Sequence, residues 1–505
     1  MARWRENCEN KRRCGAPLAG LGRSSKAKLS TPPFKNVSLG IPMLQPPPAA
    51  GSPTTHDEAR RVLRAGLLLA LPFAFMALRG RLLPPLWPFL LSCGLAFGAY
   101  AVAVARLRSC RGRGVATAIL GCALAFRLLL LVPEVSLSDD VYRYLWEGKI
   151  GNAGFNPYTK PPDDPALLSL RDAVHERVAH REIPSVYPPL AQVAFRALAA
   201  TSYHPRSWRA LVVLADLAAV LLLIRLLHRQ RLPTGHALIL AWNPLVVVEL
   251  AGSGHVDGLA LPFLVMALEA LLEHRPWRGA LSLAVGALAK LHVAIGLPFF
   301  VFRQRGVGAF LVFAVVLALA YAPFLDSGAL RGLQTYGEHW SFNSPAYDAA
   351  RQAADVLREG IINVTVRWLS RFQGIAYGIN PELLARLLLA LAYFAVLVPL
   401  LRGKGDLPRR LLLAYAFFIL LSPTIHPWYL LWLVPLLALR PLPSLILFTS
   451  TVTLSYLTVE RFRLEGVWLE ETWVRWVEFF PVIVGLALDL VRAARTCCGG
   501  SSSAR

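Results

Sequence analysis

Long apolar blocks divide the chain, and they limit its possible folds more than any other feature. A helix of roughly 20 apolar residues crosses the hydrocarbon core of a bilayer, and the blocks approach that length. Only 17% of the residues are charged, whereas soluble domains carry about 25%. We therefore predict an all-α polytopic integral membrane protein with about 11–13 transmembrane or broken helices, which excludes soluble enzymes, disordered proteins and secreted disulfide scaffolds. The clearest blocks are Val62–Leu78, Val115–Val132, Leu211–Leu227, Leu281–Phe302, Val307–Leu325 and Leu383–Leu401.

The formal charge of +22 comes mostly from arginines at the ends of these blocks. Basic residues in that position orient a membrane protein and collect on its cytoplasmic side, so we do not expect a nucleic-acid partner. Placing the basic clusters inside puts the polar segments 134–207 and 326–380 on the extracytoplasmic side. The clusters that we used are Arg106–Arg113, Arg225–Arg231, Arg275–Arg278, Arg303–Arg305, Arg402–Arg410 and Arg492–Arg495.

This topology requires three segments to enter the membrane without simply crossing it. Val186–Ala200 must dip in and return. Residues 279–302 and 411–438 must each form a hairpin of short or broken helices, with the breaks at Lys290–His292 and Ser422–Pro427. With these assignments, the unusual polar clusters of the chain fall on one face of the membrane.

The predicted domain organisation has one large membrane domain between two tails. Residues 1–56 are basic and proline-rich, which is typical of a disordered cytoplasmic tail. The transmembrane domain covers 57–495, and 496–505 form a C-terminal cytoplasmic tail. Arg79 and Arg81 remain exceptions on the outer side. The seven cysteines form no ligand-spaced cluster, so we predict neither a disulfide framework nor a metal site, and no cofactor.

Two adjacent carboxylates, Asp139 and Asp140, directly follow a predicted span and open the segment that contains Tyr142 and Arg143. A carboxylate at the membrane boundary can act as a general base on a hydroxyl or bind a divalent cation. The alternative is ordinary helix capping, because Ser-Asp-Asp suits a helix N-terminus. The sequence leaves both interpretations open.

Arg127 and Lys290 interrupt apolar blocks, and His292 follows Lys290 closely. Ionisable residues inside a membrane are costly and usually mark function. We expected Arg127 to meet Asp139, Asp140 or a phosphate, unless it extends toward the headgroups. Lys290 should face an aqueous cavity and an anion.

Other polar and aromatic residues stand at turns and helix breaks. His255 and Asp257 lie in a glycine-rich turn after Asn243-Pro244, which suits phosphate or cation contact, although a plain turn remains possible. Aromatic residues in the loops suit a sugar-stacking surface or, equally, interfacial anchoring. The candidates of this kind are Tyr187, Asn343, His426 and Trp428.

The ordered set of motifs resembles bacterial membrane glycosyltransferases of the GT-C fold, in particular the mannosyltransferases that use polyprenol-phosphate-mannose. The resemblance covers roughly residues 60–490. It rests on Asp139-Asp140-Val141-Tyr142-Arg143-Tyr144 with Trp146-Glu147-Gly148, Asn156-Pro157-Tyr158, Tyr187-Pro188-Pro189, Gly254-His255-Val256-Asp257 and His426-Pro427-Trp428-Tyr429.

The resemblance implies an inverting transfer of a hexose, with mannose as the expected sugar, from a β-linked polyprenyl-phosphate donor to a lipid or glycan acceptor. The reaction would take place on the extracytoplasmic face of the inner (plasma) membrane. Asp140 would be the base, with Asp139 as the alternative. No nucleotide-binding fingerprint is present, which agrees with a lipid-linked donor. The substrate-binding candidates are Arg127, Tyr142, Arg143, Tyr187, His255, Asp257, Lys290, His292, Asn343, His426 and Trp428.

The competing interpretation is a transporter or flippase of a polyprenyl-linked or anionic lipid. Such a protein would also contain broken helices and charged residues within the membrane. It should show an internal repeat of hydrophobic segments in two halves. The sequence shows no such repeat, and the transferase interpretation therefore leads.

Overall fold

The computed structural model describes residues 55–303, 306–325, 328, 330–368 and 380–499. These residues are mostly helical and form no strand; one isolated bridge joins Phe342 and Thr424. The predicted tail 1–56 lies almost wholly outside the described residues, because the first described helix begins at Thr55. At the other end the last helix reaches Gly499, past the predicted boundary at 495.

Six helices among the described residues are long and apolar enough to cross a membrane, and a seventh span results if one bent pair is counted. The all-α polytopic class predicted from the sequence is therefore confirmed. The six are α2 (Thr55–Leu78), α3 (Trp87–Leu107), α4 (Arg113–Leu131), α8 (Pro205–Arg229), α14 (Gly306–Tyr321, extended by η6, Ala322–Phe324) and α18 (Pro381–Arg402). Many large apolar side chains on these helices are exposed, as a lipid-facing surface requires.

The bent pair combines η3 (Thr234–Ala237) and α9 (Leu238–Ala241) with α10 (Pro244–Val247) and η4 (Val248–Ser253), at an angle of 51°. The bend begins at Asn243, whose side chain accepts hydrogen bonds from the N–H groups of Leu245 and Val246 and so starts a new helix. The π-helical turn η4 ends at Gly254, whose φ of +77° favours glycine.

The two predicted hairpins are present, and their breaks lie where the sequence placed them. In the first, α12 (Pro276–Ala289) ends at Lys290, and η5 (Leu291–Gly296) with α13 (Leu297–Arg303) returns along it. Gly279 packs on Phe300, and Gly286 packs on Val293, a pairing that only an antiparallel return produces. Gly279 has to be this small, because a Cβ there would lie 1.9 Å from the Phe300 ring.

The second hairpin runs from α19 (Leu407–Leu420) through the break at 421–426 to η8 (Pro427–Trp432) and α20 (Val434–Leu439). An ion pair between Asp406 and Arg440 joins its open end. The remaining helices of the bundle are α11 (Asp257–Leu272), α21 (Pro443–Thr451), η9 (Val452–Ser455), α22 (Tyr456–Glu465) and α23 (Thr472–Gly499).

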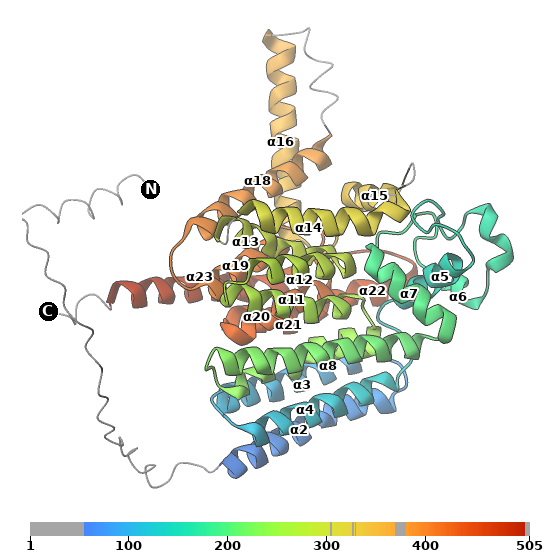
Figure 1. The fold of residues 1–505 in the computed structure, drawn as a ribbon. Helices are drawn as coiled ribbons and strands as arrows, with labels where there is room; N and C mark the ends of the chain where they lie inside the picture. Colours follow the sequence, from blue (N-terminus) through green and yellow to red (C-terminus); the bar gives the residue numbers. More distant parts are fainter. Residues whose placement is uncertain (1–54, 304–305, 326–327, 329, 369–379, 500–505) are drawn as a thin grey trace, which may run out of the picture. The chain divides into compact units, whose positions relative to one another are not determined.

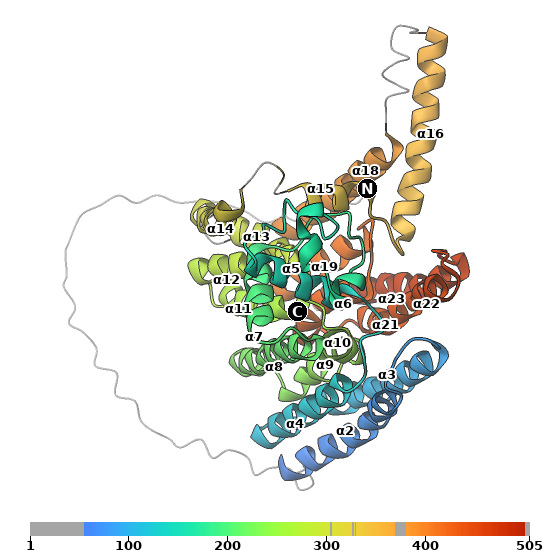
Figure 2. The same cartoon turned by 90° about the vertical axis from the view of Figure 1, so that its right-hand side faces the viewer.

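The helices pack in an order that Figures 1 and 2 both show: α2, α3 and α4 lie together, followed by α8, then α11 and α12. The segment 134–207 contributes short helices at one end of this bundle. Its helix α7, predicted as a dipping segment, is too short to cross a bilayer and packs on α5. The short helices of this segment are α5 (Asp140–Asn152), η2 (Pro165–Leu170), α6 (Ala173–Glu176) and α7 (Pro189–Thr201).

The segment 326–380 is more regular than the loop that we predicted. It contains α15 (Arg331–His339) and the long helix α16 (Pro345–Trp368), which packs against α18 (Figure 2). The part of it from 369 to 379 lies outside the described residues.

Candidate active site

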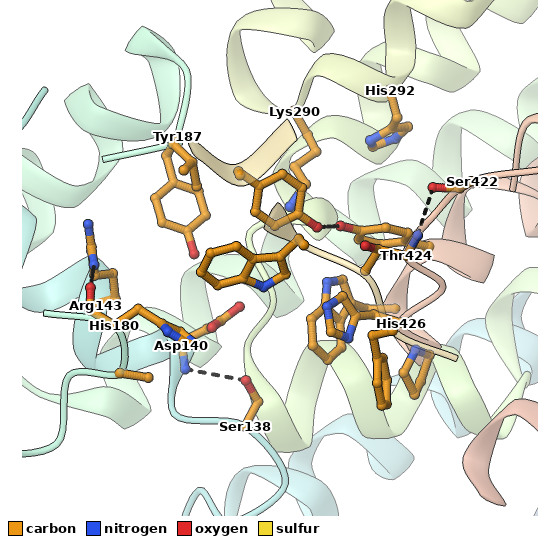
Figure 3. A pocket seen from close by; sticks show the side chains of 18 of the residues that line it. Ser138, Asp140, Arg143, His180, Tyr187, Lys290, His292, Ser422, Thr424 and His426 are labelled. Carbon is orange, nitrogen blue, oxygen red and sulfur yellow. Dashed lines mark hydrogen bonds between the residues drawn. The ribbon is translucent and has the colours of Figure 1, made fainter. Parts of the chain in front are cut away.

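A cavity of about 760 Å³ opens where the polar clusters of the sequence converge (Figure 3). Its walls come from segments far apart in the chain: 137–143, 179–188, 290–295, 333–342, 418–432, 455–463 and Trp468. No short fragment of the protein could form it. Several of the predicted clusters therefore meet in one cavity, whereas their place on one face of the membrane stays a prediction.

Asp140 is the first residue of α5, and its carboxylate points into the cavity (Figure 3). The Ser138 hydroxyl accepts a hydrogen bond from the Asp140 N–H at 3.3 Å, so Ser138 caps this end of α5. Neither aspartate side chain makes the capping hydrogen bond that the sequence offered as the alternative. The Asp140 side chain is 35% exposed, and one of its oxygens lies 3.4 Å from the Tyr144 hydroxyl.

Asp139 also lines the cavity, but both of its oxygens are engaged. Arg177 donates to one at 3.1 Å, and Arg463 donates to the other at 3.0 Å. Both carboxylate oxygens of Asp139 are thus occupied by guanidinium groups. Of the two candidate bases, Asp140 is the one whose carboxylate has no guanidinium partner among the described residues.

His255 lies directly behind Asp140 and is fully buried. Its Nδ1 is 3.6 Å from Asp140 Oδ2, and its Nε2 is 3.3 Å from Oε2 of the buried Glu249. Burial lowers the pKa of His255, but the two carboxylates outweigh it and raise the pKa to about 9. Burial likewise raises the pKa of Asp140, but His255, Lys290 and His426 together hold it below its ordinary value.

A buried arginine fixes the two loops that carry Asp140 and His255. Arg209 on α8 donates to the carbonyl of Pro133 at 2.9 Å and to that of Gly252 at 3.1 Å. Its side chain also packs under Gly254, where a Cβ would lie 2.7 Å from Arg209 Cγ. One side chain thus ties the end of α4 to the end of η4.

Lys290 lines the cavity as expected, but its anionic partner in the structure is a protein carboxylate. Lys290 Nζ lies 3.2 Å from Asp257 Oδ2 and 5.8 Å from the centre of the Tyr187 ring. Asp257 is fully buried behind the wall, and its Oδ1 accepts a hydrogen bond from Trp432 Nε1 at 2.8 Å. The anion that Lys290 meets is therefore the carboxylate of Asp257.

Aromatic rings cover much of the remaining wall. His426 stacks on Trp428 at 4.3 Å, and the other face of Trp428 stacks on His255 at 3.8 Å. His292 stacks on Trp432 at 3.9 Å, with its ring nitrogens buried and unpartnered. Flat, electron-rich faces of this kind suit the C–H faces of a sugar.

Five predicted substrate-binding residues do not line the cavity: His255 and Asp257 are buried behind its wall, and Arg127, Tyr142 and Asn343 bind other partners. Arg127 is fully buried in the bundle and pairs with Asp216 at 2.5 Å, so its expected partners, Asp139, Asp140 or a phosphate, were wrong. The Tyr142 hydroxyl accepts a hydrogen bond from Arg177. Asn343 is buried and donates to Glu478 at 2.8 Å. In each case a partner distant in sequence binds the polar group.

Several cavity residues were missed from the sequence, and Glu249 behind His255 was missed as well. Arg463 faces the cavity from α22, and its one available signal was its place at the outer end of a predicted span, against the positive-inside pattern. Glu249 lies in an apolar stretch, and a carboxylate in such a stretch is itself a signal of function that the sequence analysis did not use. The other missed lining residues are His180, Tyr336, Trp340, Trp432 and Trp468.

The described residues contain no group of three or more His, Cys, Asp or Glu side chains that could hold a metal ion. The cationic side chains at the cavity include Arg463 and Lys290, with Arg177 beside them. Arg177 and Arg463 share the single charge of Asp139, so this corner of the cavity carries one net positive charge. Arg143 is neutralised by Glu147 at 2.6 Å and contributes little to it.

Two family models match the chain. The model described as alpha-(1->6)-mannopyranosyltransferase, N-terminal domain, matches residues 73–304. The model described as MptB C-terminal domain matches residues 379–461. No curated protein and no solved structure matched the sequence in the corresponding searches. The first match contains Asp140, His255 and Lys290, the second contains His426 and Trp428, and together they cover more than half of the chain. The protein is thus a multi-pass membrane protein with a mannosyltransferase architecture of the GT-C type, and it belongs to the alpha-(1->6)-mannopyranosyltransferase family.

Proposed function

We propose that the protein transfers mannose from a polyprenyl-phosphate donor to a hydroxyl of a lipid or glycan acceptor, with inversion at the anomeric carbon. The observation that carries this proposal is the carboxylate of Asp140, which faces a large cavity beside cationic and aromatic side chains. The family match favours transfer over the transport alternative. Inversion of a β-linked donor gives an α-linkage, in agreement with the family's description.

In the proposed reaction, the acceptor oxygen attacks the anomeric carbon in line with the departing phosphate. The new C–O bond forms as the bond between the anomeric carbon and the phosphate oxygen breaks, and Asp140 takes the hydroxyl proton. Because this oxygen becomes more nucleophilic as its proton leaves, the base must lie within hydrogen-bond reach of it. The low pKa of Asp140 keeps the carboxylate ionised and ready at neutral pH.

The departing polyprenyl phosphate gathers negative charge and needs fixed positive charge nearby. Arg463 and Lys290 are the cavity cations best suited to this task. Arg463 belongs to the corner with a net positive charge, whereas Lys290 shares its charge with Asp257. We assign the phosphate to Arg463 first and to Lys290 second.

The domain and membrane assignments complete the proposal. Residues 57–495 form the transferase domain between cytoplasmic tails, and the cavity opens on the extracytoplasmic face of the plasma membrane. Single cysteines in place of Ser169 and Glu338, both exposed, test this orientation. A membrane-impermeant thiol reagent should label both in intact cells, and labelling only after permeabilisation would reverse the topology.

The decisive experiment replaces the two acids separately and measures mannose transfer from radiolabelled polyprenyl-phosphate-mannose in membranes. Asp140→Asn should lower the rate by about 10²–10⁴-fold, the usual effect of removing a general base. Asp139→Asn is the matched control, because it removes an adjacent carboxylate that is bound by arginines. Near-normal transfer by a folded Asp140→Asn protein would end the assignment.

A further inference from the structure

Glu249 is a fully buried carboxylate that does not line the cavity. Its Oε1 accepts a hydrogen bond from the Tyr456 hydroxyl at 2.7 Å, and its Oε2 faces His255 Nε2 at 3.3 Å. Within the described part of the chain, no lysine or arginine pairs with it. A buried carboxylate without such a partner is costly, so its retention needs another explanation.

His255 stands between Glu249 and Asp140, with one ring nitrogen toward each carboxylate. An ionised carboxylate only accepts hydrogen bonds, and a neutral imidazole would turn a lone pair toward one of the two. A doubly protonated ring has no such lone pair and places its positive charge between the two carboxylates. The indole of Trp428, stacked 3.8 Å away with an interplanar angle of 18°, offers the electron-rich face that a cation prefers.

We propose that Glu249 is a positioning residue of the transfer reaction and acts through His255. Glu249 holds the imidazole in place and charged, and the imidazolium fixes the Asp140 carboxylate toward the acceptor hydroxyl. The arrangement follows the logic of a catalytic triad in which a buried acid orients a histidine. This inference rests on the proposed function, because it takes Asp140 as the base.

The charged groups around Glu249, His255 and Asp140 determine what the loss of Glu249 would do. Lys290 and His426 face Asp140 together with His255, and the Tyr144 hydroxyl is beside it. Tyr456 faces Glu249 from η9–α22, and Cys93 faces it from α3. Of these groups, Glu249 and Asp140 are the two anions that keep His255 protonated.

The test is the pH dependence of mannose transfer by the purified full-length protein, with radiolabelled polyprenyl-phosphate-mannose and an octyl α-mannoside as acceptor probe. In Glu249→Gln, the imidazole loses its second carboxylate and the positive charge beside Asp140 weakens. The descending, alkaline limb of the rate profile, on which the imidazolium is lost, should move to lower pH by roughly one unit, the lower end of what a neighbouring charge does. A lower rate with an unmoved limb would overturn the proposal.

Two further variants make the result specific. Glu269→Gln is the matched control, since Glu269 is also a buried carboxylate but pairs with Arg225 and Arg229, away from the cavity, and its limb should not move. In a His255→Gln background, adding Glu249→Gln should cause no further shift. An additive shift would show that Glu249 does not act through His255.

Other measurements distinguish a folding defect, and failure of the proposed function, from failure of the proposal for Glu249. If Glu249→Gln does not fold, Glu249→Asp keeps the charge but withdraws the carboxylate, and its limb should move the same way by a smaller amount; no movement overturns the proposal. Thermal stability in detergent gives a readout independent of transfer. Because the pKa of His255 is raised to about 9, its contribution to stability is full below its unfolded pKa of about 6.5 and is lost as the pH rises toward 9. In either Glu249 variant that loss should begin at lower pH, whereas failure of the proposed function would appear as unchanged transfer in Asp140→Asn.

Discussion

Arg127 and Lys290 both interrupt apolar helical segments, and each pairs with a fully buried aspartate. Arg127 and Asp216 are entirely enclosed by the bundle, and the remaining Arg127 contacts are with backbone carbonyls of Ala123 and Ala241. Lys290 instead remains partly exposed on the cavity wall, with Asp257 behind it. The same kind of ion pair thus lies inside the helix bundle in one case and at the wall of the candidate active site in the other.

The difference teaches that a charge inside an apolar segment does not by itself identify a binding residue. What distinguishes the two is whether the cation reaches a space that a ligand can enter. An enclosed pair stabilises packing between α4 and α8, whereas a pair on a cavity wall can exchange its partner for a ligand. The following predictions test that distinction.

The largest effect is expected from Arg127→Met, which leaves Asp216 buried without its partner. The free energy of unfolding should fall by about 3–5 kcal/mol, measured by equilibrium unfolding in mixed micelles. The double variant with Asp216→Asn should recover most of this loss. Transfer per folded molecule should stay near normal. A large decrease would show that Arg127 contributes to the transfer reaction.

Lys290→Met should have a smaller effect on stability, about 1–3 kcal/mol, because Asp257 keeps its hydrogen bond from Trp432. Its effect on the donor should be larger, seen as a raised KM for polyprenyl-phosphate-mannose. Adding Asp257→Asn should restore stability but not donor use. An unchanged KM for the donor in Lys290→Met would show that the Lys290–Asp257 pair, like the Arg127–Asp216 pair, has only a structural role.

The pH profile provides a finer distinction between the two pairs. The pKa of Asp140 is held below its ordinary value in part by Lys290, so stability and activity from the ionised form are present above pH about 3.9 and are lost only as the pH falls further. Lys290→Met should move the acidic limb of the rate profile upward by less than one unit, roughly. Arg127→Met should leave it in place, and an equal shift in both would contradict the comparison.

The smallest effect is expected at Arg81, whose pair with Glu134 is exposed to solvent on both sides. Arg81→Gln should change the free energy of unfolding by no more than about 1 kcal/mol, because water already screens such a pair. Measured in the same micelles as Arg127→Met, it gives the loss of unfolding free energy for an exposed ion pair, to be compared with the loss for an enclosed one. A loss as large as that of Arg127→Met would show that enclosure is not what sets the energy.

The fold class and both helix breaks could be predicted because each has a local cause. Span length, basic joints and the prolines or polar residues at Lys290–His292 and Ser422–Pro427 are all visible in short windows of sequence. The convergence of these segments on one cavity is visible only in the structure. The partners inside the bundle could not be predicted in this way, because they come from distant helices.

Arg127 shows why the rest was not predictable. Its partner Asp216 stands 89 residues further along, inside an apolar block that looked uninterrupted. Glu249 was overlooked for the same reason, because a single acid scarcely alters the hydropathy of its segment. Only the three-dimensional packing shows that Asn343 serves Glu478 rather than the cavity.

The antiparallel packing of α11 on α12 has a consequence for the making of the protein. Asp257 begins α11 and Lys290 follows α12, so the two charges sit at the same end of this helical pair. Translocated one at a time, each would cost about 2.5–3.5 kcal/mol at mid-bilayer on insertion scales. If the two helices were inserted together, the charges would cross as a neutral pair and this cost would be smaller. The pairing that the mature protein keeps at the edge of its cavity would then also ease its membrane insertion.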